Sequence, residues 1–85
     1  MTHQPILETD SIRASVAGLW GALLKIDDVP HDVAFPDLGG DSLLLISLLT
    51  QVEDEFDVYL EAEDILDDLT VTGIARAIAK RRAEA

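Results

Sequence analysis

The stretch FPDLGGDSLLLISLLTQVEDEF, residues 35–56, decides the fold of this chain. From Ser42 to Phe56 it contains no glycine or proline, and its apolar residues recur at the spacing of one helical face. Those residues are Leu45, Leu48, Leu49, Val52 and Phe56. Asp41, just before Ser42, is of a type whose side chain accepts hydrogen bonds from the free amides of a first helical turn. The stretch therefore predicts a helix that begins at Ser42, with Asp41 as its N-cap.

Helices are also expected on both sides of this stretch. Residues 9–11 supply candidate caps for a first helix that ends near Leu24 and carries an apolar stripe. The stripe consists of Ile12, Val16, Leu19, Trp20 and Leu23. Further along, residues 62–66 predict a short helix, and Thr70 is expected to cap a last helix that ends near three basic residues. Residues 25–41 contain two prolines and two glycines and predict a long loop, held to the core by some of its apolar side chains.

The expected fold is all-α: a small bundle of three main helices plus one short helix, with a long loop between helices one and two. Eighty-five residues suffice for one compact domain and not for two, so we expect a single domain over residues 1–85. Residues 1–8 and 82–85 are expected to be flexible tails, and the initial methionine and the short polar ends indicate a free-standing chain.

Composition restricts the classes of partner. Seventeen acidic and six basic residues give a formal charge of -11, which repels nucleic acid and anionic lipid and favours basic protein surfaces. No apolar stretch approaches the roughly twenty residues of a membrane span, and no secretory signal opens the chain. Cysteine is absent, so disulfides and thiolate chemistry are excluded. We expect a cytoplasmic monomer that binds neither nucleic acid nor membrane.

The Gly-Gly-Asp-Ser-Leu turn is the strongest candidate for chemistry. It places Ser42 at a helix N-terminus, where unpaired amides favour a phosphate ester, and the glycines allow a sharp approach of the backbone. Ser42 borders the apolar stripe at an exposed end of the helix, so a large enzyme can reach its hydroxyl. Taken alone, Asp41-Ser42 favours an ordinary helix cap over a site of chemistry.

The stretch from Phe35 through Phe56 resembles the phosphopantetheine attachment region of acyl and peptidyl carrier proteins. Leu38-Gly39-Gly40-Asp41-Ser42-Leu43 stands where that family keeps its modified serine, and the expected helices occur in family order. The resemblance implies that a phosphopantetheinyl transferase moves 4′-phosphopantetheine from coenzyme A to Ser42, and that the thiol then carries acyl or aminoacyl thioesters. It also implies that Asp41 helps to present the serine and that Gly40 allows the transferase to approach.

The branch of the family is less sharply indicated. The Gly-Gly-Asp-Ser-Leu-Leu sequence resembles peptidyl carriers of nonribosomal peptide synthesis, since fatty-acid carriers more often have an acidic residue at the position of Leu44. The strong acidity and short length resemble discrete fatty-acid or polyketide carriers. We favour a discrete peptidyl or aminoacyl carrier in natural-product biosynthesis. A discrete acyl carrier is the alternative, and an unmodified acidic helical adaptor is a remote one.

A docking face follows from the angles around the second helix. Leu43 lies about 160° from the apolar stripe and is therefore expected to be exposed beside Ser42. Together with the neighbouring outward positions it predicts a small apolar contact in an acidic frame. The expected docking residues are Leu43, Ile46, Thr50, Glu53 and Asp54. The implied partners are the transferase and adenylation, acyltransferase, condensation, ketosynthase or tailoring enzymes of the pathway.

Two other site types are disfavoured. A serine hydrolase needs a base and an orienting group, and the chain offers only His3 in a tail and His31 in a loop. The acids from Glu53 to Asp68 lack the alternate spacing, central glycine and closing glutamate of a calcium loop. We therefore expect neither catalytic residues nor a metal site.

Overall fold

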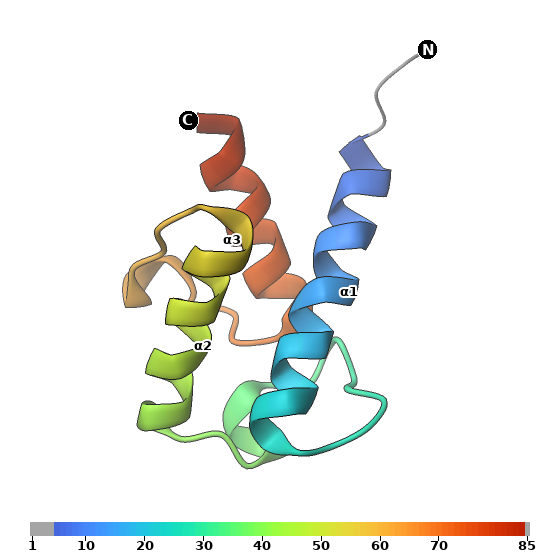
Figure 1. Cartoon of the computed structure of the whole chain (residues 1–85), viewed down its shortest axis with the longest axis vertical. Helices are drawn as coiled ribbons and strands as arrows, with labels where there is room; N and C mark the ends of the chain where they lie inside the picture. The colour runs from blue at the N-terminus through green and yellow to red at the C-terminus, as the bar shows by residue number, and fades with distance from the viewer. Residues whose placement is uncertain (1–4, 85) are drawn as a thin grey trace.

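The computed structural model describes residues 5–84, and these form three α-helices and two single-turn 3-10 helices, with no strand among them (Figure 1). The α-helices are α1 (Pro5–Leu24), α2 (Ser42–Phe56) and α3 (Val71–Glu84). The 3-10 helices are η1 (Phe35–Leu38) and η2 (Ala62–Asp64). The expected all-α bundle is confirmed. Within this part of the chain, no helix is both long and apolar enough to traverse a bilayer.

The helices place the start of α2 at one end of the bundle. In Figure 1, α1 runs antiparallel to α2 and α3, and the connection from α1 to α2 crosses beneath the bundle. The start of α1 and the end of α3 lie at the opposite end of the bundle. Ser42 is therefore presented away from both of these helix ends.

The core is built from the apolar stripes of the three helices. Its fully buried side chains include Val16 and Trp20 of α1, Leu48 of α2 and Ile74 of α3. The rings of Trp20 and Phe35 meet edge to face with centroids 4.9 Å apart. The indole Nε1 of Trp20 is buried without a hydrogen-bond partner. Phe35 thus joins the long connection to the centre of the bundle.

Backbone hydrogen bonds fix the connection between α1 and α2. The Phe35 amide donates to the Leu69 carbonyl at 2.8 Å, and the Thr72 amide donates to the His31 carbonyl at 3.1 Å. Because these bonds tie the connection to the start of α3, the path that leads into α2 is set by contacts from a distant part of the chain.

Two helices extend further than the sequence analysis expected. α1 begins at Pro5, ahead of the expected caps at residues 9–11, because proline is favoured at the first helical position, where its missing N–H is not needed. α3 continues through Glu84, and its last turn carries cations that suit the negative end of the helix dipole. Residues 5–8 and 82–84 are thus helical where tails were expected. The remaining expected tail residues, 1–4 and 85, lie outside the described part.

The short helix expected over residues 62–66 is a single 3-10 turn that ends at Asp64. The Asp64 carboxylate accepts a hydrogen bond from the Glu61 amide at 2.8 Å and closes the turn as a capping box. Ile65 then enters the core, where it is almost fully buried. The regular 3-10 pattern ends at Asp64, although the Leu66 amide still donates to the Ala62 carbonyl at 3.0 Å, so residues 65–67 continue as a turn.

Candidate functional site

The first turn of α2 is capped by Asp41, as predicted. Its backbone is extended, its carboxylate accepts a hydrogen bond from the Leu44 amide at 2.9 Å, and its carbonyl accepts one from the Leu45 amide at 2.9 Å. Helix geometry gives the amides of Ser42 and Leu43 no carbonyl partner inside α2. These N–H groups and the helix dipole make the exposed hydroxyl of Ser42 a favourable place for a phosphate ester.

Two glycines bring the chain to this position, each for a different reason. Gly39 ends η1 in the left-handed region, with φ of 100°, which side chains rarely adopt. Gly40 lies directly against the Phe35 ring, and a Cβ atom there would overlap that ring. Phe35 is itself packed on Trp20. The backbone that leads to Ser42 is therefore held in place by contact with the core.

A groove of about 410 Å³ adjoins Ser42. Its walls come from η1, from α2 and from the segment before α3, which contributes Leu66 and Leu69. Phe35 and Leu45 supply further apolar surface, and Asp41 stands at the polar end beside the hydroxyl. A chain attached to Ser42 can therefore lie against an apolar wall that begins at the point of attachment.

The five expected docking residues share the outer face of α2. Leu43 is 76% exposed and Ile46 is 60% exposed, which confirms the angular argument from the sequence. The Thr50 hydroxyl donates to the Ile46 carbonyl at 3.1 Å, and Glu53 and Asp54 are exposed further along the helix. The structure thus places an apolar patch near Ser42 and two carboxylates toward the other end of the same face of α2.

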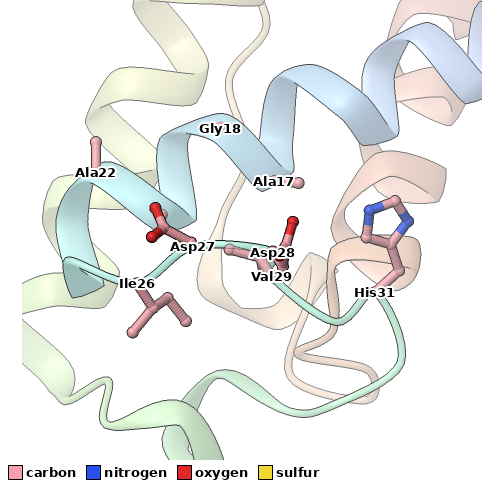
Figure 2. Close-up of a pocket in the computed structure, with 9 residues that line it drawn as sticks. Ala17, Gly18, Ala22, Ile26, Asp27, Asp28, Val29 and His31 are labelled. Carbon is pink, nitrogen blue, oxygen red and sulfur yellow. The ribbon is translucent and has the colours of Figure 1, made fainter.

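A second hollow, of about 700 Å³, lies between α1 and the connection that follows it. Figure 2 shows Asp27, Asp28 and His31 on that connection, facing the small residues of α1. Ser42 does not line this hollow, and His31 does not line the groove beside Ser42. Among the side chains that the structure describes, in residues 10–84, no cluster of histidine, aspartate and glutamate is arranged to hold a metal ion.

A known protein family matches the chain over the region that contains this site. The family model described as "Phosphopantetheine attachment site" matches residues 14–78, which span α2 and most of the bundle. The chain belongs to this family of carrier domains. The carrier is 32% identical to pyochelin synthetase PchE of Pseudomonas aeruginosa over 84 residues, which cover 96% of the carrier and only 6% of the synthetase.

Solved structures agree on the fold. The carrier superimposes on BlmI, a type-II acyl carrier protein from Streptomyces verticillus involved in bleomycin biosynthesis, with a TM-score of 0.79 and 26% identity. The match covers 85% of the carrier and 87% of BlmI. It also superimposes, with a TM-score of 0.78 and 23% identity, on a chain from the complex of the transferase Sfp with coenzyme A and a peptidyl carrier protein. That match covers 82% of the carrier and 91% of the other chain.

The cofactor of the family, 4′-phosphopantetheine, fits the residues present. The first-turn amides suit its phosphate, the contact between Gly40 and Phe35 leaves the approach free of a side chain, and the groove offers apolar surface. Sequence analysis missed Leu66 and Leu69 as neighbours of Ser42. The available signal was weak: Leu66 is an apolar residue inside an acidic segment, and it is 60% exposed.

Proposed function

We propose that Ser42 is the residue of this carrier that receives 4′-phosphopantetheine, and that the thiol of this arm carries aminoacyl or peptidyl groups as thioesters. One observation carries the proposal: the exposed hydroxyl of Ser42 opens α2 at a turn whose glycines and aspartate fit a phosphate ester. Asp41 holds the first turn of α2, and Gly40 keeps the approach open against Phe35.

The loading reaction is a phosphoryl transfer from coenzyme A. A phosphopantetheinyl transferase joins the Ser42 Oγ to the phosphorus next to the pantetheine unit, and the phosphorus–oxygen bond to the second phosphate breaks. The hydroxyl proton passes to a base of the transferase, and 3′,5′-adenosine bisphosphate leaves. The carrier contributes the nucleophilic oxygen and the helix N-terminus, and the transferase contributes the base, because the Asp41 carboxylate is held by the Leu44 amide as the cap of α2.

The outer face of α2 is proposed as the docking surface for the transferase and for the pathway enzymes. A partner that fits it has an apolar depression for Leu43 and Ile46, bordered by arginine or lysine opposite Glu53 and Asp54. Such partners are adenylation and condensation enzymes for an aminoacyl cargo. Acyltransferases, ketosynthases and tailoring enzymes would serve an acyl cargo.

The similarity to a peptide synthetase supports the aminoacyl branch, and the similarity to a type-II acyl carrier supports a discrete protein that works with separate enzymes. We propose that the carrier itself catalyses no reaction, since chemistry on the cargo needs a base and an orienting group that a carrier can borrow from its partners. The expectation of a cytoplasmic location stays a prediction.

The decisive experiment is intact mass spectrometry after incubation with coenzyme A and a broad-specificity phosphopantetheinyl transferase. The Ser42→Ala variant should gain no phosphopantetheine, and circular dichroism should show unchanged helix content because Asp41 still caps α2. Ser47→Ala, a matched change at an exposed serine on the same helix, should be loaded like the wild type. Loading of Ser42→Ala at the wild-type level would refute the assignment, because another residue would then carry the arm. Absence of loading on the wild-type protein would instead leave the unmodified adaptor as the alternative.

A further inference from the structure

A second groove runs along α2, beyond the one that adjoins Ser42. Its volume is about 410 Å³, and it lies between α2 and the chain that leads into η2. We call it the α2–η2 groove. Ile46, Leu49 and Tyr59 provide its apolar surface, and Thr50, Glu53 and Glu61 provide its polar groups. The groove therefore combines an apolar wall with two carboxylates.

The charge of the α2–η2 groove is one-sided. None of its described lining residues is basic, although Glu53 and Glu61 both belong to it. A hydrogen bond with Glu63, and the negative charge of that residue, raise the pKa of the Glu61 carboxyl above its ordinary value, and Arg81 opposes this only weakly. The negative charges that crowd Glu61 thus come from Glu63 and Asp64 outside the groove, and a cation bound in the groove beside Glu61 would offset them.

The groove lies within reach of a chain attached to Ser42. Thr50 and Glu53 are eight and eleven positions along α2 from Ser42, which corresponds to about 12 and about 16 Å along the helix axis. They also lie within about 80° of Ser42 around the axis, on the same side of the helix. An extended 4′-phosphopantetheine arm is longer than this span, so the group on its thiol can enter the groove.

We propose that the α2–η2 groove binds the cationic end of an aminoacyl group carried on the arm, with Glu53 and Glu61 facing its ammonium group. This inference rests on the proposed function, and it adds the class of cargo. The groove suits an aminoacyl group with a free ammonium better than an uncharged fatty acyl group, because the ammonium attracts the two exposed carboxylates and a hydrocarbon chain does not.

A basic side chain of a partner enzyme is the competing occupant, since Ile46, Thr50 and Glu53 also belong to the proposed docking face. The two occupants differ in what they require. Binding of the cargo occurs in the loaded carrier without any partner, and it depends on the charge of the cargo. Binding of a partner's side chain requires that partner and does not depend on which cargo is attached.

The experiment compares two cargoes of nearly equal shape and different charge. Stable coenzyme A analogues with amide-linked glycyl or propionyl groups are transferred to Ser42, and loading is verified by intact mass. NMR spectra of the isotope-labelled carrier are then recorded without any partner. Relative to propionyl, the glycyl group should move the amide signals of Thr50, Glu53, Tyr59 and Glu61. The occupancy of the groove should rise about two- to threefold, as a solvent-exposed ion pair supports.

The double variant Glu53→Gln and Glu61→Gln should remove the difference between the two cargoes, and Glu55→Gln, a change outside the groove, should preserve it. Identical spectra for glycyl and propionyl carriers would overturn the inference, and so would a difference that survives in the double variant. If neither cargo is loaded at Ser42, the proposed function itself fails, and the mass measurement reports this separately from the spectra.

Discussion

Leu43 and Leu48 lie on the same helix and have the same side chain, yet their surroundings are opposite. Leu48 is fully buried, whereas Leu43 is 76% exposed beside Ser42. The position of each around the axis of α2 produces this difference, since the helix turns about 100° per residue. One leucine stabilises the fold, and the other is available to a second molecule. The type of a residue therefore indicates little about its role until its direction is known.

The two glycines inside α1 show the same contrast. A Cβ atom added at Gly21 would come within 2.9 Å of the Ile26 carbonyl oxygen, where the chain folds back over the end of the helix. At Gly18, nothing lies within 4 Å of such an atom. A side chain at position 21 would therefore collide with the neighbouring backbone, whereas a side chain at position 18 would meet no neighbour inside the domain.

The largest expected effect is on the inward side of α2. Leu48→Asp should lower the free energy of unfolding by about 4 kcal/mol or more, because it places an unpaired charge in the core. Urea denaturation followed by circular dichroism measures this loss. A variant with wild-type stability would show that the interior face of α2 is wrongly assigned.

Leu43→Asp is the matched change on the outward side. It should leave the free energy of unfolding within about 0.5 kcal/mol of the wild type, because surface substitutions rarely cost more. Loss of the apolar contact should slow modification by the transferase about tenfold, as expected at the centre of an interface. If every partner modifies the variant at the wild-type rate, the docking face lies elsewhere.

Gly40→Ala tests the junction between the core and the attachment site. The added methyl group overlaps the Phe35 ring, so we expect a loss of about 1–3 kcal/mol in the free energy of unfolding, typical of overpacking. The shift of the approach to Ser42 should also slow loading by the transferase. Thermal unfolding measures the stability, and intact mass recorded at intervals measures the loading rate. If neither changes, Gly40 does not contribute to the site.

The glycine pair in α1 should respond with opposite signs. Gly18→Ala should raise the free energy of unfolding by about 0.5–1 kcal/mol, because alanine favours a helix and meets no neighbour. Gly21→Ala should lower it by a similar amount, since the backbone at Ile26 must move. Parallel denaturant curves compare the two variants. A higher free energy of unfolding at both positions would show that the backbone at Ile26 moves aside without loss of stability.

The smallest expected effect concerns the half-buried pair of Asp64 and Arg81, whose side chains meet at 2.8 Å. The hydrogen bond from the Glu61 amide, followed by Arg81, lowers the pKa of the Asp64 carboxyl below its ordinary value of 3.8. The stabilisation is therefore present above that pH and is lost as the pH falls below it. Asp64→Asn should be slightly less stable at neutral pH, and the difference should shrink in acid. A difference that is constant with pH would contradict this account.

Local spacing allowed much of the fold to be predicted. The helical period gave α2 and the inward face of α1, and capping chemistry correctly gave Asp41 and Thr70, whose hydroxyl accepts a hydrogen bond from the Gly73 amide at 2.9 Å. The start of α1 and the end of η2 were wrong. The preference of a single residue at a helix end is small, so the sequence places such an end only to within one or two residues.

The candidate site was predictable on α2 itself and not across the bundle. Ser42, Leu43 and Ile46 are related by the turn of one helix, so the sequence sufficed to place them. The proximity of Leu66 and Tyr59 to the α2 grooves depends on how the chain between α2 and α3 folds back, through the Phe35–Leu69 backbone bond and the capping of η2. Such tertiary contacts leave no periodic signal in the sequence.

The edge-to-face contact between Trp20 and Phe35 gives this carrier a built-in optical reporter. Trp20 is the sole tryptophan of the chain, and its ring touches a phenylalanine that also walls the groove beside Ser42. An indole in such a dry environment emits at shorter wavelength than one in water. Any group that displaces Phe35 should therefore change the colour and intensity of the fluorescence, so attachment of the arm can be followed in real time without a label.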